Sequence, residues 1–286
     1  MYKKGVIRKY TGKDSYYFVA DCVNRIGAKA FLNNLFLERI NLSNGVVSIG
    51  DNAFAGCSSL RRVDIPAERY RDGGYFFNSC TAFGGHDIER VTITGSLISI
   101  GKNAFQDCIS LNDIDMPDSV RKIGDRAFAD CTGLTCIKIP ESVKSIGKNA
   151  FIGAKNLEKL NIPDSICDFG FNEMNIRNRA FFNCKLLSDV KIGNRVKRIG
   201  AHSFEGCRLI REIIIPPSMK KIECSAFKNC RALESINIPS EVRKIGKNAF
   251  AGCPKLTIYC PVGSCAHLYA IQNKINYAIV KTERRY

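Results

Sequence analysis

The sequence predicts an α/β repeat solenoid, in which short parallel strands stack in 23-residue repeats between capped ends. Two observations predict this fold class: phenylalanines recur at one interval, and the same consensus surrounds them. Within three groups the interval is 23 residues, and between the groups it is 28 and then 30 residues. The groups are Phe31, Phe54 and Phe77; Phe105, Phe128 and Phe151; and Phe181, Phe204, Phe227 and Phe250. The longer intervals predict loops near Gly84 to Ile88 and between Gly170 and Arg179.

The consensus around each phenylalanine reads L-x-x-I-x-I-P-x-x-V-x-x-I-G-x-x-A-F-x-x-C. It is clearest at residues 111–128, 134–151 and 233–250, and it degrades at 69–76 and 168–179, next to the two predicted loops. A fixed period of about 20 to 29 residues with an L-x-x-L-x-L core is typical of a leucine-rich repeat. Each repeat of that kind adds one short strand to a continuous parallel sheet.

Within the consensus, side chains two positions apart point to the same face of a strand. Ile137 and Ile139 are therefore expected in the core, and Lys138 on the surface. Pro140 is expected to end this strand because proline has no N–H to donate to a ladder. The V-x-x-I-G segment is expected to form a second inward-facing edge. Its glycine, Gly147 in this repeat, suits a turn with positive φ or a close approach of two backbones.

Over nearly the whole chain the consensus resembles the BspA-like, or Treponema pallidum type, leucine-rich repeat. The opening GVIRKYTGKDSYYFVADCVNRIGAKAF is similar to the degenerate first repeat of that family, with Ala20 in the proline position. The closing LTIYCPVGSCAHLYAIQNKINYAIV is similar to its terminal short helix and last strand. In that helix we expect Ser264 to be the N-cap and Ala266, Tyr269 and Ala270 to be buried.

This resemblance implies a binding function, because members of the family are commonly surface or secreted proteins of bacteria and some protists, linked to adhesion to host or matrix proteins. The repeat pattern predicts one solenoid domain over residues 1–286. An N-terminal cap repeat is expected at 1–22, regular repeats at 23–259, and a C-terminal cap with a short helix and a final strand at 260–286.

Charge and hydropathy limit which partners and which cellular compartment are expected. The chain has 43 Lys and Arg against 27 Asp and Glu, a formal net charge of +16, which favours acidic partners. The first residues, MYKKGVIRKYTGKDSYYFVAD, hold no apolar run long enough for an export signal, and no stretch is long and apolar enough to span a membrane. A cytoplasmic location is expected if Met1 is the native start, whereas the family resemblance implies a cell-surface or secreted one.

Eight cysteines each follow a repeat phenylalanine by three residues, and this row has two interpretations. Stacked cysteines could serve redox or metal chemistry, or they could be small buried side chains with inert thiols. The second is favoured because no C-x-x-C pair is present, so we expect no metal site and no cofactor. The three histidines lie in different parts of the chain, outside any nucleophile–base motif, and we expect no enzymatic activity. The eight cysteines, called here the cysteine ladder, are Cys57, Cys80, Cys108, Cys131, Cys184, Cys207, Cys230 and Cys253.

Two surfaces are candidate partner-binding sites, and a monomer is expected. The first is the outward position of the strands, called here the strand face: Lys138, Asn161, Lys191 and Asn237. The second, called here the basic stripe, lies between the valine and isoleucine of V-x-x-I: Arg121, Lys122, Lys144, Lys197, Arg198, Lys220, Lys221, Arg243 and Lys244. An acidic protein partner is the leading prediction, and a nucleic acid or another polyanion is the alternative. For the stripe, a solvated face without a partner also remains open.

Overall fold

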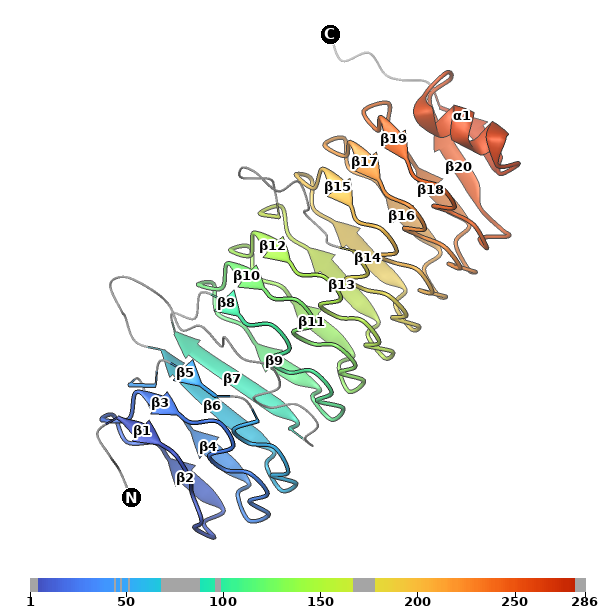
Figure 1. Cartoon of the computed structure of the whole chain (residues 1–286). Coiled ribbons are helices and arrows are strands. Elements are labelled where there is room, and N and C mark those ends of the chain that lie inside the picture. Colours follow the sequence, from blue (N-terminus) through green and yellow to red (C-terminus); the bar gives the residue numbers. More distant parts are fainter. Residues whose placement is uncertain are drawn as a thin grey trace.

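The computed structural model describes residues 5–43, 45–46, 48–50, 52–67, 88–95, 99–166 and 178–280. These residues form flattened coils stacked from the N-terminal end to a helix near the C-terminus (Figure 1). The result is a parallel-strand solenoid of about 10 turns with repeats of about 23 residues, which confirms the predicted fold class. Phe77, Cys80 and Cys167 lie outside the described residues, as do most residues of both predicted loops.

One side of the solenoid carries the longer strand of each coil. Neighbouring strands pair in parallel with matching repeat positions opposite each other, so that Ile137 pairs with Leu160 and Leu160 with Val190. As predicted, Ile137 and Ile139 are buried and Lys138 is exposed. The longer strands are β2 (Tyr16–Phe18), β4 (Arg39–Asn41), β6 (Arg62–Ala67), β7 (Arg90–Gly95), β9 (Asp113–Asp115), β11 (Cys136–Lys138), β13 (Lys159–Ile162), β14 (Asp189–Ile192), β16 (Glu212–Ile214), β18 (Ser235–Asn237), β20 (Thr257–Cys260) and β21 (Asn276–Ile279).

The V-x-x-I segments form a second set of parallel strands, each two residues long. In every one the isoleucine points inward, which confirms the second inward-facing edge. The short strands are β1 (Val6–Ile7), β3 (Arg25–Ile26), β5 (Ser48–Ile49), β8 (Ser99–Ile100), β10 (Lys122–Ile123), β12 (Ser145–Ile146), β15 (Arg198–Ile199), β17 (Lys221–Ile222) and β19 (Lys244–Ile245).

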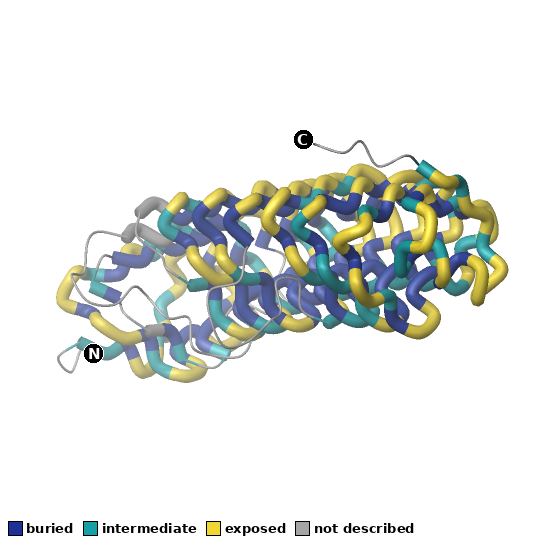
Figure 2. Tube along the Cα trace, turned by 90° about the horizontal axis from the view of Figure 1, so that it is seen from above, coloured by how far each residue is buried: buried dark blue, intermediate teal, exposed yellow. Residues whose placement is uncertain are grey.

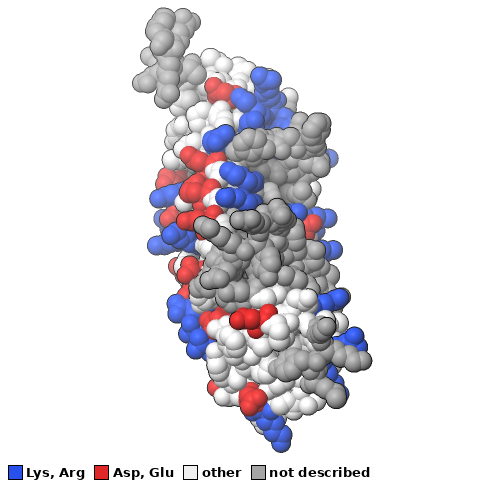
Figure 3. All heavy atoms as spheres, turned by 90° about the vertical axis from the view of Figure 1, so that its left-hand side faces the viewer, with Lys and Arg blue, Asp and Glu red and all other residues white. Residues whose placement is uncertain are grey.

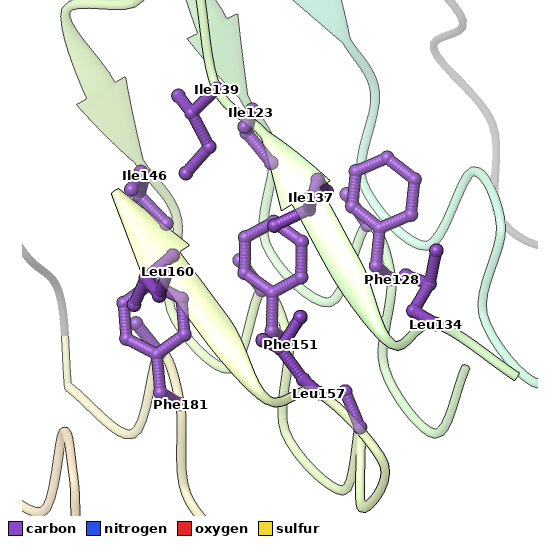
Figure 4. Close-up of a cluster of buried hydrophobic side chains, with 14 of the residues drawn as sticks. Ile123, Phe128, Leu134, Ile137, Ile139, Ile146, Phe151, Leu157, Leu160 and Phe181 are labelled. Carbon is purple, nitrogen blue, oxygen red and sulfur yellow. The ribbon is translucent and has the colours of Figure 1, made fainter. Parts of the chain in front are cut away.

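The phenylalanines form the centre of the core. From Phe105 to Phe250 each described ring stacks on the next with centroids 5.2 to 5.5 Å apart. Figure 4 shows three of these rings, Phe128, Phe151 and Phe181, with leucines and isoleucines of the same layers around them. Buried and exposed residues alternate along the coils throughout the described stack (Figure 2). A repeat therefore completes its core only by contact with its neighbours.

The consensus glycine serves a close approach of two backbones. A Cβ added to Gly147 would lie 2.4 Å from the carbonyl carbon of Gly124 in the layer below, closer than any real Cβ contact. Positive φ occurs two residues later instead, at non-glycine residues such as Asn149 with φ 58°. Of the two roles predicted for this glycine, the structure thus supports the backbone contact.

Both ends of the described stack differ from the regular coils. Helix α1 (Cys265–Gln272) covers the last layer, with Ser264 as its N-cap and Ala266, Tyr269 and Ala270 buried, as predicted. The Tyr269 ring packs edge-on against Phe250, with centroids 5.9 Å apart. At the other end Tyr10 and Tyr17 pack against Phe31. The boundaries between caps and regular repeats, after residue 22 and after residue 259, remain a prediction.

The stacked core predicts a large stability loss when one ring is removed. We expect Phe204→Ala to lower the free energy of unfolding by about 3–5 kcal/mol, because a fully buried ring between two others leaves a cavity. Leu186→Ala is the control, since that side chain is 40% exposed, and it should change stability by about 0.5 kcal/mol or less. Urea unfolding followed by circular dichroism measures both. Equal losses in the two variants would contradict the stacked-core description.

Candidate functional site

The register of the short strands brings part of the basic stripe together. Lys221 of β17 pairs with Arg198 of β15 on one side and with Lys244 of β19 on the other. Lys197, Lys220 and Arg243 each precede one of these residues by one position, and a backbone hydrogen bond joins Lys220 to Lys197 and Arg243 to Lys220. Three successive layers therefore carry two adjacent cations each.

The nine side chains of the stripe are not equally accessible. Arg121, Lys122, Lys144, Lys197, Arg243 and Lys244 are exposed, whereas Arg198, Lys220 and Lys221 are partly covered. Arg198 also forms an ion pair of 2.8 Å with Glu223, in which both side chains are more than four-fifths buried. Glu223 occupies the position that is glycine in most repeats. This substitution neutralises one of the cations in the stripe.

The stripe is also less continuous, and less confined, than the sequence suggested. Ser145 of β12 follows Lys122 in the ladder, and Cys167 and Asp168 at the next position lie outside the described residues. At the N-terminal end Arg25 of β3 takes the same place, opposite Ser48 of β5. Arg25 was missed, although the segment VNRIG from Val23 to Gly27 fits the consensus. A cation at this position is therefore not exclusive to the C-terminal half.

Charge is unevenly distributed on the surface. On the face drawn in Figure 3, a run of Asp and Glu lies between groups of Lys and Arg. Opposite charges also pair across layers of the solenoid, as Arg90 does with Asp113 and Arg39 with Asp64. The formal charge of +16 is therefore not a uniform positive field.

The strand face has the predicted orientation. Lys138, Asn161 and Lys191 are exposed and occupy matching positions on β11, β13 and β14, and Asn237 is exposed on β18. Two apolar side chains lie in the same row. Ile214 is 75% exposed beside Asn237, and Tyr259 is 39% exposed on its other side.

The cysteine ladder is a structural feature of the core. Six of its members are buried and Cys253 is half-buried, while Cys80 lies outside the described residues. The thiol of Cys207 donates a hydrogen bond of 3.3 Å to the carbonyl of Phe181, one layer away, and Cys57, Cys131, Cys184, Cys230 and Cys253 make the equivalent bond. Burial raises the pKa of the Cys207 and Cys184 thiols. A hydrogen bond with Cys230 lowers the pKa of Cys253.

The described part of the chain holds no cluster of metal-binding side chains, and its histidines lie apart from one another. Within it, no three His, Cys, Asp or Glu residues are placed to hold a metal ion, and no helix is long and apolar enough to cross a membrane. His202 pairs with Glu205, which also contacts Lys228. His267 accepts a hydrogen bond from the backbone of Gly263 beside the N-cap. His86 lies outside the described residues.

Comparison with known proteins identifies one family. A family model for the BspA type leucine rich repeat region, in six copies, matches residues 15–83, 81–174 and 174–264. Among solved structures, the chain is 25% identical to a leucine rich cell surface protein from Faecalibacterium prausnitzii, with 93% of this chain and 92% of that chain covered and a TM-score of 0.37. It is also 25% identical to a leucine rich repeat protein of T. pallidum, with 72% and 82% covered and a TM-score of 0.47. No curated protein matches the chain.

The buried thiols predict a specific dependence of stability on pH. Burial raises the pKa of the Cys57 thiol from 9.0 to about 11, which a backbone hydrogen bond from Asn34 only partly offsets. Between these values the unfolded thiol has lost its proton and the folded one keeps it, so the stability that this group contributes falls as pH rises. The stability difference between the wild type and Cys57→Ala should therefore shrink by about 1 kcal/mol per pH unit from pH 9 to 11.

Denaturant unfolding at pH 8, 9, 10 and 11 measures this difference. Cys136→Ala, which changes an exposed cysteine, is the control and should leave the pH dependence of stability as in the wild type. Parallel curves for wild type and Cys57→Ala would show that the Cys57 thiol titrates normally in the folded protein.

Proposed function

The chain belongs to the BspA-type leucine-rich repeat family, and on this premise we propose that it is a non-catalytic scaffold that binds an acidic partner protein through its basic stripe. Repeats of this family are typically non-catalytic. The observation that carries the proposal is the register of β15, β17 and β19, which aligns Arg198, Lys221 and Lys244 on adjacent layers. An elongated row of cations suits an extended acidic surface.

The repulsion between neighbouring cations supports a binding role for this row. Cations on neighbouring layers are about one strand spacing, 4.8 Å, apart, and in water each such pair repels by somewhat under about 1 kcal/mol. Ser48 and Ser99 avoid this cost at the same position in earlier layers. An acidic partner offsets the repulsion, and the summed charge accelerates its association.

A nucleic acid or another polyanion is the second candidate, because phosphates recognise the same exposed cations. The two candidates differ in salt dependence. Binding driven by phosphate contacts weakens steeply with ionic strength, whereas a protein interface with an apolar centre weakens much less.

The compartment in which the scaffold acts is part of the proposal. The family resemblance favours an adhesion-type role at a cell surface.

The proposal predicts that removing five positive charges from the stripe weakens binding to an acidic polymer. We expect Lys197, Lys220, Lys221, Arg243 and Lys244, all changed to Ser, to weaken binding of poly-L-glutamate by at least about tenfold at low salt, because five favourable charges are lost. Arg198 is retained because its removal would leave Glu223 unpaired. Fluorescence anisotropy with labelled polymer measures the affinity.

The matched control removes the same charge elsewhere. Lys9, Lys13, Lys102, Lys159 and Lys255 are exposed at positions that do not line up on successive layers, and changing them to Ser should leave most of the binding intact. Equal weakening in both variants would show that only net charge matters. A parallel titration with duplex DNA over a range of salt concentrations decides between the two partner classes.

A further inference from the structure

The strand ladder opens at one place in the C-terminal half. Hydrogen bonds join β11, β13 and β14 into one sheet and β16, β18, β20 and β21 into another, and among the described residues none joins β14 to β16. The other sides of the same two coils remain bonded, through β15 with β17 and through Phe181 with Ser203. The coils therefore separate only on the strand face.

The two coils at the opening depart from the consensus. Gly193 stands where most repeats have proline, and a Cβ added to it would lie 2.5 Å from the carbonyl oxygen of Pro163, so the coil of β14 packs closely on the preceding one. In the coil of β16 the consensus proline, Pro216, is followed by a second proline, Pro217.

The opening exposes side chains that belong to the core. Val190 and Ile192 of β14 are only partly buried, whereas their counterparts Ile213 and Ile215 in the next coil are 2% and 3% exposed. A break in the ladder does not by itself have this effect. The ladder is also interrupted between β9 and β11, where Ile114 and Ile137 are each 6% exposed.

A groove of about 770 Å³ lies over this opening, and we call it the strand groove. Its apolar lining includes Val190, Ile192, Leu209 and Ile214, with Leu209 45% and Ile214 75% exposed. Ligand-binding clefts in proteins typically have volumes in this range.

The charge at one end of the strand groove is opposite to that of the chain as a whole. Asp189, Glu212 and Glu234 line the end where the strands begin, and Arg211 is the cation among them. All four side chains are exposed. Lys191 lies farther along β14, toward the apolar part. The strand groove therefore combines an acidic end with an apolar centre.

We propose that the strand groove binds an extended segment of a partner protein that carries one Lys or Arg and one large apolar residue two positions apart. Glu212 and Ile214 are two positions apart on β16 and point to the same face, about 6.6 Å from each other. An extended peptide repeats this spacing, so its cation can reach the acidic end while its apolar side chain covers Ile214.

The mixed lining favours a peptide over a hydrocarbon chain. A lipid tail in the strand groove would remove water from Asp189, Glu212 and Lys191 without offering them partners, which is unfavourable. A peptide segment supplies both apolar contacts and hydrogen bonds. This proposal concerns another side of the coil than the basic stripe, and the two can fail independently.

The test uses labelled heptapeptides with threonine at the remaining positions and either Arg-Thr-Leu or Leu-Thr-Arg at the centre. We expect the better of these two orders to bind the full chain at least tenfold more tightly at 0.15 M salt than the matching peptides with Glu for Arg or Ser for Leu. Ile214→Ser and the double variant Glu212→Gln with Glu234→Gln should each weaken this binding about tenfold. Hydrogen exchange should slow at the amides of β14 and β16 when the peptide is bound.

Two controls change matching residues far from the strand groove. Ile109→Ser replaces another apolar side chain that is 55% exposed, and Glu141→Gln another exposed carboxylate, and neither should alter peptide binding. The five-serine variant of the basic stripe should bind the peptide as the wild type does. The proposal is overturned if neither order binds, if the Glu-containing peptide binds equally well, or if the control variants lose as much affinity as the groove variants.

Discussion

The structure depends on the contact between one coil and the next. Rings such as Phe204 and Phe227 stack with centroids 5.3 Å apart, close to the spacing of strands in a sheet. A single coil buries too few apolar side chains to offset the conformational entropy of ordering it, so each coil is stable only within the stack. This constraint explains the close packing of Gly147 on Gly124 and the hydrogen bonds that six of the described cysteine thiols donate to a phenylalanine carbonyl of another layer.

The same stacking places side chains of one chemical type in rows along the solenoid. A residue type that recurs at one consensus position is placed at one strand spacing from its copies, whatever its charge. Rows of cysteine become buried and inert, because burial raises the pKa of most of these thiols. Cations within one row repel one another, and the ion pair of Arg198 with Glu223 neutralises one of them. Function in such a protein is therefore expected to lie in rows rather than in convergent pockets.

The strand groove arises where this regularity is relaxed. Gly193 packs closely on Pro163, and the prolines at 216 and 217 begin where the next strand ends. Val190 and Ile192 beside this opening are only partly buried, whereas the equivalent side chains of the next coil are buried. The acidic residues at its end reverse the sign of charge that composition alone suggests. One solenoid can thus offer two surfaces of different chemistry.

The 23-residue period by itself determined the fold class, the inward positions of Ile137 and Ile139, the buried cysteine row and the helix cap at Ser264, because each follows from local periodicity or from a local hydrogen bond. It also placed the basic stripe in a row. Only the tertiary structure decided that Arg198 is paired with Glu223 and that β14 separates from β16. These features depend on contacts between coils, and the distance between two coils is set by side chains on both, which no single repeat encodes.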